Sequence, residues 1–124
     1  MIKTKCVDFN LIKLNLDPPK LAKWQTTLSQ QPVGSLLALL CNAIQGTRPI
    51  KFQWLRNGVE IQNNIHLNRF SIDIKLSFSQ FTLHDIQVTD SGNYSCLVSN
   101  DFGFDSQWSV LEVKGLIEYS SFEF

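Results

Sequence analysis

The feature that most constrains this chain is a set of four residues, Cys41, Trp54, Tyr94 and Cys96. Both cysteines lie in strand-like apolar stretches, and such a pair indicates one structural disulfide formed in an oxidising compartment. Trp54 lies on the strand that follows Cys41, where its ring would pack on the bridge. Tyr94 precedes Cys96 by two residues within DSGNYSC (90–96), the pattern of a tyrosine corner. These spacings predict two facing β-sheets joined by a Cys41–Cys96 disulfide around Trp54.

The rest of the chain alternates between short strand-like segments and turn signals. Ile50, Phe52 and Trp54 alternate with their neighbours at the period of a half-buried strand. Asn57-Gly58 is the strongest short hairpin signal. No helical period interrupts these segments, so the pattern favours seven or more short strands. The predicted strands are 20–28, 35–43, 50–55, 69–75, 77–86, 94–99 and 107–113, with turns at 31–34, 46–49, 57–58, 89–92 and 100–103.

The strands, the cysteine pair and the tyrosine corner together predict an all-β fold, an immunoglobulin-like (I-set) sandwich of two antiparallel sheets. Arg69 opens the predicted strand 69–75, and Asp90 lies in the turn 89–92. In such a sandwich an arginine at this place usually pairs with the acid of that turn. We therefore expect an Arg69–Asp90 ion pair, the alternative being an arginine whose charge lies in water.

Charge and motifs exclude several function classes. The 11 basic side chains balance the 11 acidic ones, and no basic run is present, so nucleic acid and anionic membranes are poor partners. His66 and His84 stand alone, without cysteines or carboxylates at metal-ligand spacing. No nucleophile elbow or phosphate loop is found. The chain is therefore expected to have no enzymatic activity, metal, cofactor or small-molecule substrate.

The chain resembles immunoglobulin domains of the Dscam cell-adhesion family in four stretches, PPKL (18–21), GTRPIKFQWLRNG (46–58), DSGNYSCLVSNDFG (90–103) and LEV (111–113). The similarity is greatest to the alternatively spliced variable domains of arthropods, including the shortened Dscam proteins of chelicerates. It implies homophilic cell–cell recognition, as in neuronal recognition, by an extracellular domain of a larger single-pass cell-surface protein. The apolar SLLALLC (35–41) departs from the family pattern.

The expected partners are an identical domain on an opposing cell and neighbouring immunoglobulin domains of the same protein. Two alternatives stay open at this point. The chain could be a soluble immune-recognition module, or a non-binding spacer domain of a larger receptor.

An apolar row on one strand is the candidate partner interface. If Cys41 faces the core, alternation turns every second residue before it outward. Single exposed leucines are ordinary, but a row of them indicates an interaction surface. The alternative is that neighbouring side chains or a loop cover the row. With the outward residues of the adjacent strand, the predicted interface comprises Leu36, Ala38, Leu40, Gln80 and Thr82.

Two further residues are expected on the outside of the other sheet. Asn93-Tyr94-Ser95 is the one Asn-x-Ser/Thr match in the sequence. Because Tyr94 points inward, Asn93 points outward and is a candidate N-glycosylation site, with a solvated asparagine as the alternative. Trp108 is a second, weaker candidate contact residue.

The domain pattern covers residues 17–114, with a non-domain extension at 1–16 and a tail at 115–124. Cys6 falls in the extension and has no obvious partner. No signal of secretory type and no apolar run of membrane-spanning length is visible. We expect one exon of a larger, alternatively spliced gene, read with adjacent non-coding sequence, so that both ends are disordered. The alternative is an edge strand at 9–16.

Overall fold

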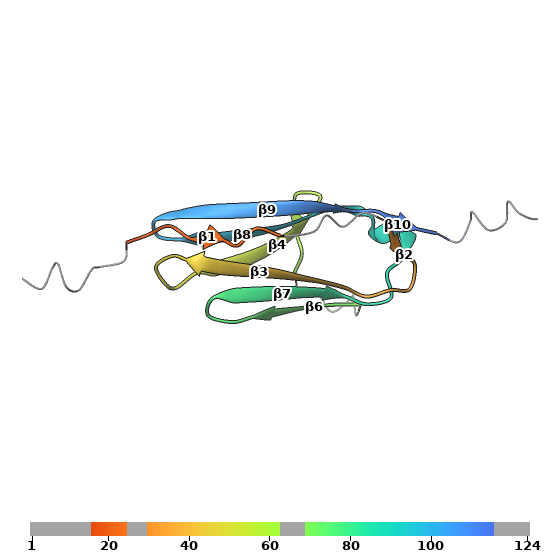
Figure 1. Ribbon diagram of the computed structural model, residues 1–124, viewed down its shortest axis with the longest axis horizontal. Coiled ribbons are helices and arrows are strands. Elements are labelled where there is room, and N and C mark those ends of the chain that lie inside the picture. Colours follow the sequence, from red (N-terminus) through yellow and green to blue (C-terminus); the bar gives the residue numbers. More distant parts are fainter. Residues whose placement is uncertain (1–15, 25–29, 63–68, 116–124) are drawn as a thin grey trace, which may run out of the picture.

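The structure describes residues 16–24, 30–62 and 69–115. They contain two four-stranded sheets and one short strand pair. The coordinates are a computed structural model, drawn as a ribbon in Figure 1. One sheet has the strand order β1-β3-β7-β6 and the other β5-β4-β8-β9. The strands are β1 (Lys20–Leu21), β2 (Gln31–Pro32), β3 (Leu37–Gln45), β4 (Lys51–Arg56), β5 (Val59–Glu60), β6 (Phe70–Ile74), β7 (Phe78–Leu83), β8 (Gly92–Asn100), β9 (Gly103–Leu111) and β10 (Val113–Lys114).

The two sheets pack face to face, which confirms the predicted all-β sandwich. Pairing within each of the two larger sheets is antiparallel. Inward residues alternate with outward ones along β3 and β7, as the period of a strand requires. The core between the sheets contains Cys41, Trp54, Phe81, Val98 and Leu111, each at most 1% exposed.

The prediction of a turn at 31–34 is wrong for its first two residues. Gln31–Pro32 forms β2, which pairs in parallel with β10 through Gln31↔Val113 and Pro32↔Lys114. The backbone N–H of Gln31 donates to the carbonyl of Glu112 at 2.8 Å. Only 33–34 is a turn, with Gly34 at φ +90°. The proline tolerates this position because β2 lies in a two-stranded pair, where few ladder bonds are needed from it.

The ends of several predicted strands also shift. The first predicted strand, 20–28, ends early, because β1 spans only Lys20–Leu21 and residues 22–24 are not in a strand. Residues 25–29 of that prediction lie outside the described part. The strand predicted at 35–43 begins and ends two residues later, as β3. β9 begins at Gly103 rather than at 107, because Asn100 and Gly103 already pair across a tight turn.

The Asn57-Gly58 hairpin forms as its sequence indicates. Arg56 pairs with Val59, so Asn57 and Gly58 are the whole loop. Both have positive φ, 51° and 84°, which is the geometry of a type I′ turn. The predicted turn at 89–92 overlaps a short 3-10 helix, Val88–Asp90.

β1 is bound to both sheets. It pairs with β3 through Leu21↔Ala43. The backbone N–H of Leu21 also donates to Oδ2 of Asp105 on β9, at 2.9 Å. The start of β1 lies toward one end of the long axis and β10 toward the other (Figure 1).

Residues 1–15 and 116–124 lie outside the described part. Cys6, the possible edge strand at 9–16 and the exon hypothesis therefore stay predictions, and so do the domain limits 17–114.

Candidate functional site

A disulfide and a side-chain hydrogen bond join the centres of the two sheets. Cys41 on β3 and Cys96 on β8 form a disulfide. Trp54 is the neighbour of Cys96 in the β4–β8 register, and Ser79 is the neighbour of Cys41 in the β3–β7 register. The indole Nε1–H of Trp54 donates to Oγ of Ser79 at 2.9 Å, so the buried indole is satisfied. The disulfide and this hydrogen bond therefore run side by side between the sheets.

Trp24 extends this core toward the edge of the sandwich. Its ring stacks on Trp54, with ring centroids 6.2 Å apart and an interplanar angle of 12°. Its Nε1–H donates to the carbonyl of Leu40 at 2.6 Å. Trp24 therefore holds the segment after β1 against β3.

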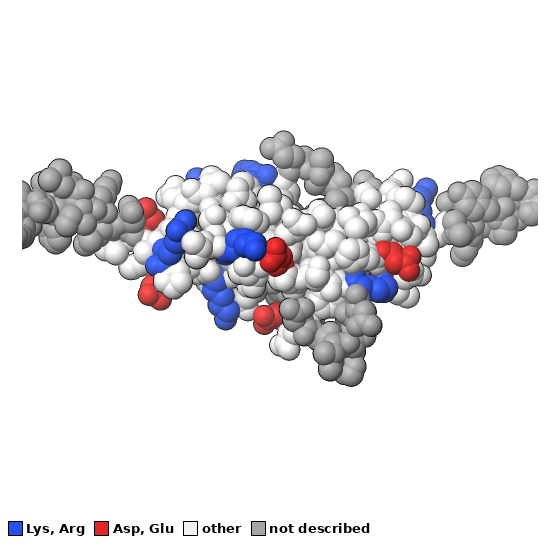
Figure 2. Space-filling model, turned by 90° about the horizontal axis from the view of Figure 1, so that it is seen from below, with Lys and Arg blue, Asp and Glu red and all other residues white. Residues whose placement is uncertain are grey.

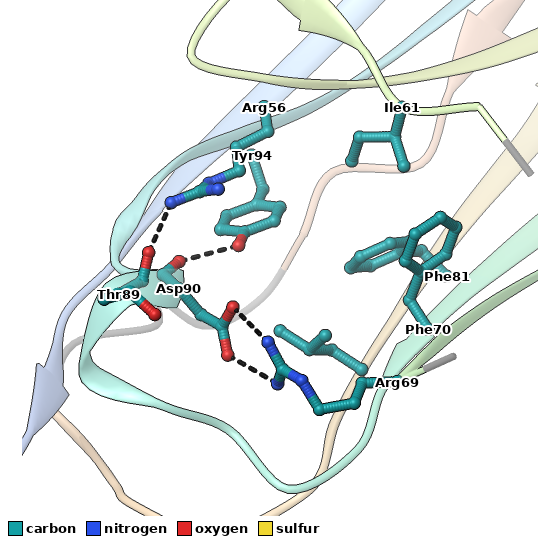
Figure 3. A pocket seen from close by; sticks show the side chains of 9 residues that line it. Arg56, Ile61, Arg69, Phe70, Phe81, Thr89, Asp90 and Tyr94 are labelled. Carbon is teal, nitrogen blue, oxygen red and sulfur yellow. Dashed lines mark hydrogen bonds and ion pairs between the residues drawn. The ribbon is translucent and has the colours of Figure 1, made fainter. Parts of the chain in front are cut away.

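Tyr94 forms the corner that its sequence context indicates. The side chain is 2% exposed, and its hydroxyl donates to the carbonyl of Asp90 at 2.6 Å (Figure 3). Burial raises the pKa of the Tyr94 phenol, so the hydroxyl stays a donor at neutral pH. This bond holds the 3-10 turn against β8.

The carboxylate of Asp90 binds Arg69 in a two-pronged ion pair (Figure 3). Nη1 of Arg69 donates to Oδ2 at 2.8 Å and Nη2 to Oδ1 at 2.9 Å. The backbone N–H of Gln87 adds a third bond, to Oδ2 at 2.7 Å. Burial alone would raise the pKa of Asp90, but the bonds from Arg69 and Gln87 outweigh it and lower the pKa below its ordinary value.

A pocket of about 270 Å³ opens beside this corner, between Tyr94 and the aromatic rings of Phe70 and Phe81. Arg56 lines it and donates from Nη2 to the carbonyl of Thr89. Nε of Arg56 is buried and has no hydrogen-bond partner among the described residues. Two of its lining residues, Ile61 and Arg69, flank in the sequence the residues 63–68 that lie outside the described part, so we assign the pocket no ligand.

The outer side of β3 and β7 carries the row of residues expected at an interface. Leu36, just before β3, is 56% exposed and Leu40 is 47% exposed. Ala38 lies between them and pairs with Thr82, while Leu40 pairs with Gln80. Gln80 and Thr82 are half-buried and bond to each other at 3.2 Å. We define these residues as the β3–β7 face: Leu36, Ala38, Leu40, Gln80 and Thr82.

The outer side of the other sheet is apolar as well. Phe104, Trp108 and Val110 on β9 are 70%, 64% and 52% exposed; we define these three residues as the β9 stripe. Asn93 is exposed on the neighbouring strand β8, and it pairs with Val110.

Charged side chains are mixed in sign on the side of the molecule where β6 lies. Figure 2 shows lysines and arginines interspersed with aspartates and glutamates among uncharged surface. Asp73 on β6 forms an ion pair with Lys75, with Oδ1 and Nζ at 3.7 Å.

His84 is exposed and belongs to no metal-ligand cluster in the described ranges 16–24, 30–62 and 69–115. His66 lies outside those ranges. Within them no group of three His, Cys, Asp or Glu side chains could hold a metal ion. The same ranges contain no helix long and apolar enough to span a membrane.

Comparison with protein families matches this architecture to one group. The model described as "Immunoglobulin domain" matches residues 18–100. The chain belongs to the immunoglobulin family. The disulfide between the sheets, the indole beside it and the tyrosine corner of this immunoglobulin domain all lie within the matched range.

Curated relatives of the immunoglobulin domain are membrane-bound, receptor and adhesion proteins by name. Membrane-bound pro-neuregulin-1 of Gallus gallus is 31% identical over 93 residues, which are 74% of this chain and 15% of the relative. The fibroblast growth factor receptor of Ciona intestinalis is 29% identical, over 73% of this chain and 12% of the receptor. The cell adhesion molecule Dscam2 of Drosophila melanogaster is 31% identical, over 62% of this chain and 4% of Dscam2. The chain spans less than a sixth of each of these proteins.

Solved structures share the fold at lower sequence identity. The titin I-band fragment I67–I69 has a TM-score of 0.70 and 24% identity, over 80% of this chain and 33% of that chain. The Dscam1 Ig7 domain, isoform 5, has a TM-score of 0.68 and 22% identity, over 78% of this chain and 97% of that chain. These similarities show an immunoglobulin sandwich and do not extend to function.

Three residues that bond or stack at the centre of the domain are not predicted as site residues from the sequence. Ser79 receives the bond of Trp54, Trp24 stacks on the same indole, and Arg56 binds the turn beside Asp90. The alternation of β7 placed Ser79 inward, where a small hydroxyl on an apolar face is a signal for a buried hydrogen bond. The roles of Trp24 and Arg56 depend on non-local contacts, and no local pattern marks them.

Proposed function

We propose that this immunoglobulin domain is an extracellular recognition module that binds an identical domain on an opposing cell through the β3–β7 face. The observation that carries the proposal is the exposure of Leu36 and Leu40 on the outside of β3, whose inward residues Leu37, Leu39 and Cys41 are buried. Apolar surface of this kind gains roughly 25 cal/mol per Å² when it is removed from water. A row of such side chains on a regular sheet is therefore a candidate for association.

The shape of the face suits a copy of itself. Ala38 lies between two leucines, so the row has a shallow gap flanked by two larger side chains. In a twofold pair the same residues meet from both sides, and a leucine of one copy can lie over Ala38 of the other. Thr82 and Gln80 border the row with polar groups that already bond each other, so little unsatisfied polarity is buried on pairing.

Adhesion through such a domain relies on many weak contacts. A stable interface buries about 800 Å² per partner, which is more than one row of three residues supplies. Affinity per pair is therefore low, and many copies on two cell surfaces raise it through effective concentration. The two ends of the domain lie at opposite ends of the long axis (Figure 1), an arrangement suited to neighbouring immunoglobulin domains joined head to tail.

The comparisons support the class of protein to which this proposal belongs. One relative bears the name cell adhesion molecule Dscam2, and others are named as membrane-bound or receptor proteins. We extend this to a Dscam-type variable domain of a cell-surface protein, close to the shortened forms of chelicerates, on the sequence stretches that resemble that family.

The test is the double substitution Leu36→Lys and Leu40→Lys in the full chain. Analytical ultracentrifugation is expected to show concentration-dependent self-association of the native protein and a monomer for the variant. The melting temperature should hardly change, because both side chains are about half exposed or more.

Leu76→Lys is the matched control. Leu76 is 72% exposed between β6 and β7, so this variant makes the same chemical change away from the face and should associate like the native protein. A native protein that stays monomeric at all concentrations would instead favour the spacer function. A large loss of stability in the double variant would show that the leucines are packed rather than available.

A further inference from the structure

The β9 stripe is an apolar surface that the β3–β7 proposal leaves unused. Its three residues alternate with inward residues along β9, so Phe104, Trp108 and Val110 share the outer side of the second sheet. Trp108 is 64% exposed and Val110 beside it 52%, and neighbouring apolar side chains of this size form a surface that an occupant can cover.

The strand register places one modifiable side chain beside this stripe. Asn93 lies directly opposite Val110, and Ser95 lies directly opposite Trp108. Side chains directly opposite each other have Cβ atoms about 5 Å apart, and diagonal neighbours such as Asn93 and Trp108 about 7–8 Å apart. A group attached to the amide of Asn93 therefore reaches Val110 and the indole of Trp108.

The residue opposite Trp108 leaves room for such a group. Ser95 is small and half-buried, so no large side chain of β8 stands between Asn93 and the indole. Ser95 is also the hydroxyl residue of the Asn93-Tyr94-Ser95 acceptor sequence. Among the described residues no hydrogen bond involves the side-chain amide of Asn93, which is exposed.

We propose that an N-linked glycan on Asn93 packs over the β9 stripe and covers Trp108 and Val110. The donor is an oligosaccharide linked to a polyprenyl diphosphate. Nδ2 of Asn93 forms a bond to C1 of the first N-acetylglucosamine and loses a proton. The bond from C1 to the diphosphate oxygen breaks, and the polyprenyl diphosphate leaves with the electron pair. The apolar C–H side of the first sugar then lies against the indole ring.

A glycan on Asn93 would change which surface of the domain is open to other proteins. With the glycan in place, the exposed indole and the valine beside it are removed from water and from contact with other proteins. A second copy of the chain is the rival occupant of the stripe, and the glycan would exclude it. The inference does not depend on self-association through the β3–β7 face, because the two surfaces lie on opposite sheets.

The test compares two substitutions at one position in the full chain, secreted from eukaryotic cells behind a cleavable signal. Ser95→Thr keeps the acceptor sequence, whereas Ser95→Ala removes it and leaves Asn93 and the stripe in place. Glycopeptide mass spectrometry should find Asn93 occupied in the native and Ser95→Thr proteins and unoccupied in Ser95→Ala.

Acrylamide quenching of tryptophan fluorescence measures whether the glycan covers Trp108. Trp108 is the most exposed of the three tryptophans, since Trp54 is 1% exposed and Trp24 is half-buried. The quenching constant of Ser95→Ala should be clearly higher than that of Ser95→Thr, because loss of the glycan opens the indole of Trp108 to acrylamide. The difference should vanish when both proteins also carry Trp108→Phe.

Enzymatic trimming gives the same comparison without a mutation. Cleavage that leaves one N-acetylglucosamine should keep Trp108 protected, because the first sugar is the one within reach. Complete removal of the glycan should expose Trp108.

An unoccupied Asn93 in secreted protein would overturn the proposal, and so would equal quenching with and without the glycan. Self-association of the glycosylated protein that Trp108→Lys abolishes would overturn it in favour of a second copy.

Discussion

Asp90 accepts four hydrogen bonds that join three parts of the domain. Its carboxylate accepts three hydrogen bonds, two from Arg69 and one from the backbone of Gln87. Its carbonyl accepts the hydroxyl of Tyr94. One residue therefore joins the start of β6, the 3-10 turn and β8, and its charge is stabilised where burial alone would oppose it.

Asp90→Asn is expected to lower the free energy of unfolding at pH 7 by roughly 1–2 kcal/mol. Bonds between charged groups are worth more than this when buried, but the Arg69 side chain is 35% exposed and water screens the pair. Because the pKa of Asp90 is lower in the folded than in the unfolded state, the contribution is complete above the unfolded pKa of about 3.9. It is lost as pH falls through the lower folded pKa.

Urea unfolding of both proteins at a series of pH values checks this. The difference between native and Asp90→Asn should be constant from neutral pH to about pH 5 and should shrink toward zero in stronger acid. A difference that does not change down to pH 2 would mean that the charge of Asp90 does not contribute.

Among the elements, two turns need glycine for different physical reasons. Gly58 has φ +84°, and a Cβ added there would meet nothing within 4 Å. Gly46, after β3, has φ +138°, and its added Cβ would lie 2.7 Å from Cα of Pro19. The first glycine is needed for backbone conformation alone, whereas the second also lets the segment before β1 approach β3.

Gly58→Ala is therefore expected to cost about 1 kcal/mol of unfolding free energy from backbone strain. Gly46→Ala should cost clearly more, because Pro19 must also move and carries β1 with it. Chemical denaturation measures both values. Hydrogen exchange adds a local readout, because the amide of Ala22, which bonds to the carbonyl of Asn42, should exchange faster only in Gly46→Ala. Equal costs for the two variants would show that the approach of Pro19 is not constrained.

For the whole molecule, the Cys41–Cys96 bridge joins the two sheets across a sequence separation of 55 residues. A loop of that size, when closed, removes enough entropy from the unfolded chain to stabilise the fold by about 4 kcal/mol. That is a large share of the 5–15 kcal/mol typical of a domain.

The double variant Cys41→Ala, Cys96→Ala should therefore lose about 4 kcal/mol in urea unfolding. Tryptophan fluorescence can follow the transition, because Trp54 lies beside Cys96. In the native protein, peptide mapping should find Cys41 linked to Cys96 and Cys6 unpaired. Cys6 linked to either of the two, or a loss below 1 kcal/mol, would contradict this role of the bridge.

Local sequence was sufficient where a feature depends on alternation or on turn chemistry. The inward direction of Cys41, Trp54 and Tyr94 and the outward direction of Leu36 and Leu40 follow from the period of a strand. The hairpin at Asn57-Gly58 follows from residues that tolerate positive φ. These features are properties of a few neighbouring residues, so the order of amino acids by itself determines them.

Only the tertiary structure decided which distant segments meet. Gln31–Pro32 pairs in parallel with β10, where the sequence predicts a turn because Pro32 is followed closely by Gly34. The stacking of Trp24 on Trp54 and the position of Asn93 opposite Val110 likewise depend on the register between strands. That register is set by how two whole sheets pack around a common core, and no short stretch of sequence contains that information.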